Sequence, residues 1–377
     1  MSGSPSSRLL RRVARGLGVA ALVVSLGVLV PYLVAEGIYS LARGTSLAYD
    51  RYLRWFADST PQDPRTEMIT NVGEITALLD LFKANAVALG NGPFSALKTD
   101  AASINREEGG CLIQKPNLRK TMSYLRSNLF NPFDQITYFY DTGRTLPPEV
   151  TRFFARYGVR ELHLTTNEHG ERLTLPPIQS ADKVLVAGDS VAQGAMLDDS
   201  ETLASQLQSQ DRARQYINLG ISGAAAADIV CALDKAAARY HGQIRELIYV
   251  FCENDFSDSL PYGTPQELIA WLGQLQQREG IERVVLLYMP YIYNVVPEVT
   301  RLPGHSHRNF PTYHEQKQRL LALAGQAGFT IVDFLDITNA QRQAVGSQFA
   351  PLALFVDHAH LSKLGVELLL PRLTAVH

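Results

Sequence analysis

The chain has 377 residues, of which 46% are hydrophobic and 19% are charged, a composition typical of a globular protein with a sizeable core. The formal net charge is −2 and basic residues cluster only at the N-terminus, so no nucleic-acid partner is predicted. The three cysteines form no CxxC pair and no Cys/His cluster with metal-ligand spacing. This odd and sparse set argues against a disulfide framework and says little about the redox compartment.

The N-terminus has the pattern of a membrane anchor. Residues 1–15 contain four arginines and no acid, and residues 17–35 carry no charge. At about 1.5 Å per residue, this run is long enough to cross a hydrocarbon core of about 30 Å. The arginines favour a cytoplasmic N-terminus. We predict a cytoplasmic tail over 1–15 and an uncleaved, single-pass signal anchor over 16–42. A cleaved signal peptide is the alternative, but its apolar region would usually be shorter, and no convincing small-x-small cleavage site follows Ala35.

Residues 43–180 are predicted to form a mixed α/β extension of unknown role. Helical patterns occur near 47–57, 74–89 and 149–157, and residues 160–166 alternate like a strand. Residues 95–145 are polar and rich in turns, with aromatic residues gathered at 130–140. We interpret these aromatic residues as core, and a sugar-binding surface is the alternative.

From residue 183 onward, strands and helices alternate. Apolar runs with strand character lie at 183–187, 215–219, 246–251, 283–289 and 329–332. Helical patterns lie between and after them, at 201–208, 224–240, 265–279, 312–327 and 362–373. This alternation indicates βαβ units and a parallel sheet covered on both faces. We predict one doubly wound α/β domain over 181–377.

The first of these strands ends in Gly188-Asp189-Ser190. A glycine lets the chain bend sharply, and the serine is left at the carboxyl edge of the sheet, where open α/β folds bind ligands. Ser190 is therefore a candidate nucleophile. The alternative is a simple turn, because all three residue types are common in turns.

A nucleophilic serine needs a base, and the segment before the last helix offers Asp357 and His360. Their spacing lets one tight turn bring the carboxylate to the imidazole, where it would fix the tautomer. His358 is the competing base, but it is adjacent to Asp357 and would point elsewhere. A polar turn that caps the helix through Ser362 is the alternative interpretation.

Donors for an oxyanion are expected after the next two strands. Gly223 precedes an alanine-rich helix, with Gly220 as the alternative position, and Asn254 follows an apolar strand. A loop glycine and an Asx turn are the plainer interpretations. We interpret Cys252, two residues before Asn254, as a core residue because no histidine lies near it in the sequence.

Together these four segments resemble the blocks of the SGNH hydrolases, also called the GDSL esterase/lipase family. The GDS motif with Gly194 four residues after Ser190 is similar to the first block, and Gly223 to the second. Glu253-Asn254-Asp255 resembles the third block and Asp357 to His360 the fourth. The segment 165–177 resembles the linker in membrane-anchored bacterial members.

The resemblance implies Ser190 as nucleophile and His360 as base, with Asp357 behind it. It implies an oxyanion hole made of the Ser190 and Gly223 N–H groups and the Asn254 side chain, in a three-layer flavodoxin-like fold. Two departures stand out. Val191 replaces the leucine of GDSL, and Cys252-Glu253 stands where a glycine is common, so that Glu253 would narrow the pocket or contact substrate.

We therefore expect a membrane-anchored esterase whose catalytic domain lies outside the cytoplasm, in the periplasm or at the cell surface. It would remove a short acyl group, such as acetyl, from a cell-envelope glycan, with no metal or cofactor. Its rate should fall as acid protonates His360. The loop 290–310, with His305 and His307, is interpreted as solvated, and a position at the border of the site is the alternative.

Three other functions remain open. They are a lysophospholipase or thioesterase acting on lipid acyl esters, an O-acyltransferase to a glycan hydroxyl, and a non-catalytic scaffold that binds glycan. An intact set of Ser190, Asp357 and His360 argues against the scaffold.

Overall fold

The computed structural model describes residue 35 and residues 104–125, 138–141, 160–256, 264–297, 313–346, 350–356 and 359–374. The chain divides into two units, 1–56 and 57–377, and all the elements below belong to the second. The predicted tail, the anchor apart from Ala35, and the helices at 47–57, 74–89 and 149–157 lie outside the described residues. No helix within those described ranges is long and apolar enough to span a bilayer.

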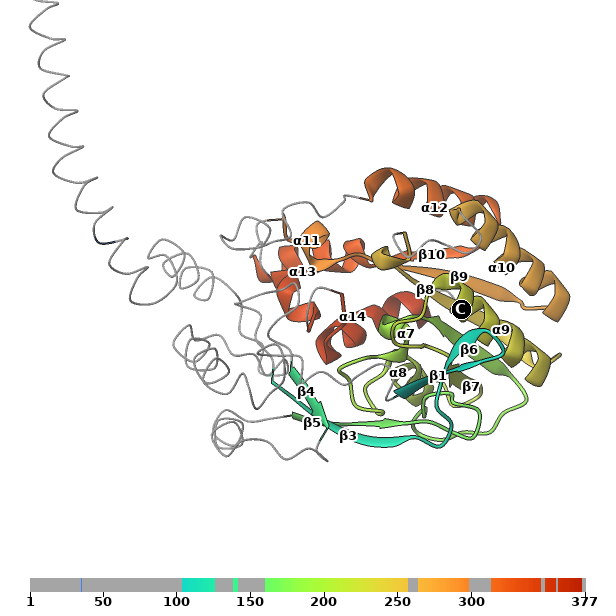
Figure 1. Ribbon diagram of the computed structural model, residues 1–377. Helices are drawn as coiled ribbons and strands as arrows, with labels where there is room; N and C mark the ends of the chain where they lie inside the picture. Colours follow the sequence, from blue (N-terminus) through green and yellow to red (C-terminus); the bar gives the residue numbers. More distant parts are fainter. Residues whose placement is uncertain are drawn as a thin grey trace, which may run out of the picture. The chain divides into compact units, whose positions relative to one another are not determined.

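A five-stranded parallel sheet forms the centre of the second unit (Figure 1). Its strands follow the order β10-β9-β8-β6-β7. The prediction of five strands is confirmed, with ends that differ from the predicted ones by at most two residues. The strands are β6 (Lys183–Gly188), β7 (Gln215–Asn218), β8 (Ile244–Cys252), β9 (Arg283–Met289) and β10 (Thr330–Asp333). Every residue of β6 is buried, as expected for a parallel sheet covered on both faces.

Helices cover the two faces of this sheet and complete the predicted three-layer α/β architecture. One face packs against the apolar sides of α9 (Ala226–Arg239), α10 (Pro265–Glu279) and α12 (His314–Gln326). The other elements, α8 (Leu203–Gln210), α13 (Phe334–Val345) and α14 (Lys363–Thr374), contact β7, β9 and one another. Apart from α13, these helices were predicted to within two residues at each end.

Several short helical elements were not predicted. They are α7 (Ser190–Gln193), α11 (Ile292–Val295) and the 3₁₀ helices η3 (Glu253–Phe256) and η5 (Ala350–Leu354). The longer helix α13 was also missed because it begins directly after β10, with Asp333 as both the last strand residue and the N-cap. With no loop between them, strand and helix give no separate signals in the sequence.

The extension before the sheet contains strands that the sequence interpretation placed in turns. An antiparallel hairpin joins β1 (Asn105–Glu108) to β2 (Cys111–Gln114). A second antiparallel sheet has the order β4-β3-β5, from β3 (Arg119–Leu125), β4 (Tyr138–Asp141) and β5 (Arg160–Thr165). The strand predicted at 160–166 is confirmed as β5, whereas β1, β2, β3 and β4 lie within the segment 95–145 that was predicted to be rich in turns. Gly109 and Gly110, both with positive φ, are the hairpin signal that was overlooked.

Cys111 of the hairpin and Cys231 of α9 form a disulfide, with their Cα atoms 6.2 Å apart. The expectation against a disulfide is therefore wrong. An odd cysteine count is compatible with one bond and one free thiol, and the two partners are 120 residues apart in the sequence. The third cysteine, Cys252, is free and fully buried as predicted, and burial raises the pKa of its thiol well above its usual value.

Candidate active site

The turn after β6 places Ser190 at the carboxyl edge of the sheet. Gly188 has φ 154°, and a Cβ there would lie 2.6 Å from the Val250 carbonyl oxygen, so no larger residue fits. The chain then enters α7 directly. Asp189 caps this short helix by accepting a hydrogen bond of 2.8 Å from the Val191 N–H. Gly194 ends it in the left-handed conformation.

His360 lies against Ser190. Its Nε2 is 2.8 Å from the Ser190 Oγ, although the two residues are 170 positions apart. Both side chains are partly buried. Backbone hydrogen bonds from Val356 N–H to the His360 carbonyl, and from Ser362 N–H to the Leu354 carbonyl, close the segment that carries the imidazole. This geometry lets His360 act as base toward the Ser190 hydroxyl.

The remaining members of the predicted histidine segment, Asp357 and His358, lie outside the described residues. The structure therefore places one of the two candidate histidines beside Ser190. The orienting role of Asp357 stays a prediction.

The Asn254 side chain is held by Asp189, the residue that precedes Ser190. The first residues after β8 form η3, in which the Asn254 amide nitrogen donates to the Asp189 carboxylate over 2.8 Å. Asp189 thus links the ends of the neighbouring strands β6 and β8. Sequence reasoning used this aspartate only as part of a motif and assigned it no role. The pairing orients the Asn254 amide, whose nitrogen carries two hydrogens.

The two candidate glycines after β7 do different things. The Gly220 N–H already donates to Asn218 Oδ1 over 3.0 Å, and a Cβ on Gly220 would lie 1.9 Å from the Gln193 nitrogen. Gly220 therefore allows the loop to pack directly on the backbone of α7. Gly223 is exposed and has φ 75°, and its N–H has no acceptor among the described residues. Of the two, Gly223 is the one able to donate to a ligand.

Glu253 holds a loop. Its carboxylate accepts hydrogen bonds from the Tyr288 hydroxyl, the Tyr291 N–H and the Asn294 amide. Its exposed fraction is 3%, and burial raises the pKa of this carboxyl in spite of the three donors. Glu253 therefore fixes the segment after β9, including the start of α11.

Arg172, which sequence reasoning missed, supports the turn and short helix that carry Ser190. The Arg172 side chain is fully buried and donates to the Gln193 and Gly194 carbonyls at the end of α7, over 3.0 and 2.7 Å. It also donates to the His163 and Leu197 carbonyls. Its Nε pairs with Asp199 at 3.0 Å. Burial lowers the pKa of Arg172 and raises that of Asp199, and their mutual attraction opposes both shifts.

The predicted chemistry of Ser190 and its neighbours uses side chains and backbone N–H groups alone. Within the described part of the chain, no group of three or more His, Cys, Asp or Glu residues is arranged to hold a metal ion.

No protein-family model matches the chain, and no curated protein matches it. Several solved structures are similar over about half of it. They include a member of the lipolytic protein G-D-S-L family from Veillonella parvula, with 13% identity over 52% of this chain and 98% of that one and a TM-score of 0.38. An acetyl xylan esterase is 16% identical over 52% of this chain and 98% of that one, with a TM-score of 0.40. Axe2, an acetylxylan esterase from Geobacillus stearothermophilus, is 17% identical over 52% of this chain and 94% of that one, with a TM-score of 0.37.

Proposed function

We propose that this chain is a serine esterase of the SGNH type. The observation that carries the proposal is the 2.8 Å approach of His360 Nε2 to Ser190 Oγ at the carboxyl edge of a parallel sheet. A serine with an adjacent imidazole is the arrangement that acyl transfer through a serine nucleophile needs.

The reaction follows from these positions. His360 accepts the hydroxyl proton while Ser190 Oγ attacks the ester carbonyl carbon, and the carbonyl oxygen becomes an oxyanion. The Ser190 and Gly223 N–H groups and the Asn254 amide donate to that oxygen. The imidazolium then gives its proton to the leaving alcohol, which departs and leaves an acyl-Ser190 ester. A water molecule, deprotonated by His360, attacks this ester and releases the carboxylic acid, while Ser190 regains its proton. Asp357 is assigned the role of orienting His360.

The site of action is proposed to lie outside the cytoplasm, behind a single-pass anchor over 16–42. The arginine-flanked uncharged run supports the anchor, and the Cys111–Cys231 disulfide supports an oxidising compartment. An esterase in this position meets acylated glycans of the cell envelope. We propose short acyl groups, such as acetyl, on such a glycan as its substrate.

The test compares hydrolysis of p-nitrophenyl acetate and p-nitrophenyl octanoate by the detergent-solubilised full chain and its variants. Ser190→Ala and His360→Ala should each lower kcat by about 10⁴-fold or more, since nucleophile and base act as one unit. The exposed His314 supplies a matched control, and His314→Ala should retain full activity. Wild-type activity in Ser190→Ala would overturn the assignment of the nucleophile.

The acyl group is tested in the same assay. Turnover of acetate together with a poor rate on octanoate supports the short-acyl esterase, and release of acetate from an acetylated polysaccharide would extend the result to a glycan. Preference for octanoate would replace the glycan by a lipid ester as the substrate class.

A further inference from the structure

Two amide side chains of the β1–β2 hairpin contact the loop that carries Gly223. Asn105 and Gln114 are directly opposite each other in the hairpin, and both are almost fully buried, with exposed fractions of 4% and 2%. Each donates to a carbonyl of the loop after β7. We propose that Asn105 is a positioning residue for the oxyanion hole and that the hairpin belongs to the catalytic apparatus. This inference rests on the proposed esterase function.

The contact of Asn105 involves the peptide unit whose N–H is the expected oxyanion donor. Its Nδ2 donates to the Ser222 carbonyl oxygen over 2.6 Å. The Ser222 carbonyl and the Gly223 N–H belong to one planar trans peptide, so they point in opposite directions. Fixing the carbonyl therefore fixes the direction of the N–H. A hydrogen bond accepted by the carbonyl also polarises the peptide and strengthens its N–H as a donor.

Such control is needed at this position because the turn hydrogen bond from the Ala224 N–H to the Ile221 carbonyl, over 3.1 Å, does not fix the direction of the central Ser222–Gly223 peptide. The Gly223 backbone is left-handed, an added Cβ would meet nothing within 4 Å, and the residue is exposed. A glycine peptide at the surface is free to rotate between several conformations. The Asn105 side chain supplies the anchor from the buried side.

Gln114 ties the same loop to the nucleophile helix. Its Nε2 donates to the Gly220 carbonyl, and its Oε1 accepts from the Gln193 amide over 2.9 Å. Gln193 is the last residue of α7, which begins at Ser190. One side chain of the hairpin therefore sets the spacing between the helix of the nucleophile and the loop of the oxyanion donor.

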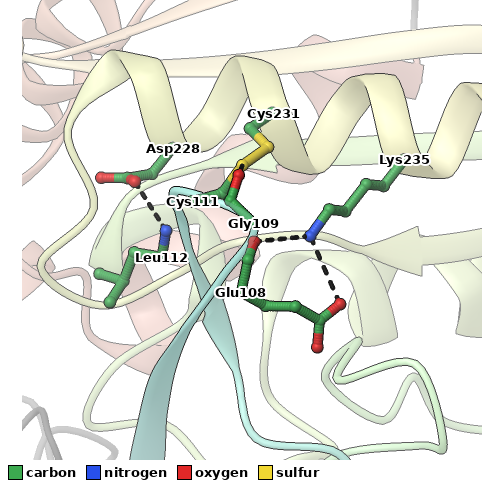
Figure 2. The surroundings of a disulfide bond; sticks show 7 residues. All are labelled: Glu108, Gly109, Cys111, Leu112, Asp228, Cys231 and Lys235. Carbon is green, nitrogen blue, oxygen red and sulfur yellow. Dashed lines mark hydrogen bonds and ion pairs between the residues drawn. A yellow bond between two sulfur atoms is a disulfide. The ribbon is translucent and has the colours of Figure 1, made fainter.

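The hairpin is itself fastened to α9, the helix that follows this loop. The Cys111–Cys231 disulfide joins them, and Lys235 reaches the Glu108 carbonyl over 3.2 Å (Figure 2). Asp228 accepts from the Leu112 N–H over 2.8 Å through one oxygen (Figure 2). Its other oxygen accepts from the Ala225 N–H over 3.1 Å. Hairpin, loop and helix are thus held in one fixed arrangement.

The experiment compares wild type, Asn105→Asp, Asn105→Ala and Glu107→Ala. A carboxylate has the shape of the asparagine amide but cannot donate to the Ser222 carbonyl, whereas Glu107 is exposed on the same hairpin and is the matched control. We expect Asn105→Asp to lower kcat on p-nitrophenyl acetate by about 10–100-fold, less than the 10²–10³-fold typical for loss of a whole oxyanion donor, with KM changed less than about 3-fold. Glu107→Ala should match wild type.

A second readout separates positioning from loss of folded protein. Phenylboronic acid forms a tetrahedral anion on a serine nucleophile, so its inhibition constant reports on the oxyanion hole. We expect this constant to rise by the same factor by which kcat falls, whereas partial unfolding alone would lower kcat and leave the constant unchanged. Asn105→Ala, which adds no charge, gives the same comparison if the aspartate variant is destabilised.

The possible failures are distinguishable. An active wild type whose kcat and boronate affinity are unchanged in both Asn105 variants would overturn the positioning role and leave the esterase intact. A folded wild type that neither hydrolyses esters nor binds the boronic acid would overturn the proposed function, and this inference with it.

Discussion

The parallel sheet and the β1–β2 hairpin hold their residues in contrasting ways. Strands β6 and β8 are buried along nearly their whole length in an apolar core shared with α9, α10 and α12. The hairpin has short strands, and three residues of β1 are exposed. Its attachment is made of a disulfide, backbone contacts and the amides of Asn105 and Gln114. The sheet places Ser190 by packing, whereas the hairpin secures the neighbouring loop by polar bonds.

Because of this difference, a single substitution should destabilise the two regions to different extents. In the sheet, the stability is distributed over many apolar contacts, each of which contributes a small part. In the hairpin and the segment after β5, a few buried polar groups each hold several partners, and losing one leaves those partners unsatisfied. Three variants, each with a control, test this contrast between packing and polar attachment.

Arg172→Met should have the largest effect. It would remove the cation from a site where Asp199 and four backbone carbonyls are its partners. We expect a loss of about 3–5 kcal/mol in the free energy of unfolding, because a buried carboxylate is left without its partner. Urea unfolding of the variant measures this. Arg212→Met, at an exposed position in the same part of the chain, should change the value by less than about 0.5 kcal/mol. If both variants changed the free energy of unfolding by the same amount, a stabilising role of the buried Arg172 contacts would be contradicted.

Loss of the Cys111–Cys231 disulfide should have the second-largest effect on stability. The bond closes a loop between residues 120 positions apart, so replacing Cys111 and Cys231 by serine is expected to lower the free energy of unfolding by about 2–5 kcal/mol. Treating wild type with a thiol reductant should produce a similar loss, and the double variant serves as control because the reductant has no bond to break in it. Wild-type stability that persists after full reduction would show that the polar contacts alone hold the hairpin.

The smallest effect is expected at the point where the loop meets α7. In Gly220→Ala, the new methyl group would lie against backbone atoms of Ala192 and Gln193, so the loop and helix must separate. We expect a loss of about 1–3 kcal/mol by overpacking, together with lower kcat. Gly273→Ala, in the interior of α10 with open space around it, should instead gain about 0.5–1 kcal/mol. Thermal unfolding of the pair checks both signs, and a stable, fully active Gly220→Ala would contradict the close packing.

The alternation of strands and helices from residue 183 onward was readable because each strand is a run of apolar residues bounded by polar turns. The same regularity placed Ser190, Gly223 and Asn254 just after strand ends. The hairpin escaped notice because four-residue strands with charged exposed positions look like a polar loop. The burial of Arg172 could not be predicted from its neighbouring residues, because they do not indicate that its partners are Asp199 and the end of α7.

The layered α/β architecture and the turn that carries Ser190 could be predicted from the sequence, because hydrophobic periodicity and short motifs are local properties of the chain. The DxxH motif also singled out His360, whose Nε2 the structure places 2.8 Å from the Ser190 Oγ. The long-range pairings became visible only in the tertiary structure. They are the Cys111–Cys231 bond, the Arg172 contacts and the hydrogen bond from Asn105 to the Ser222 carbonyl. These contacts join residues separated by 9 to 120 positions. Their pairing depends on how the whole chain packs, and no local pattern of residues records it.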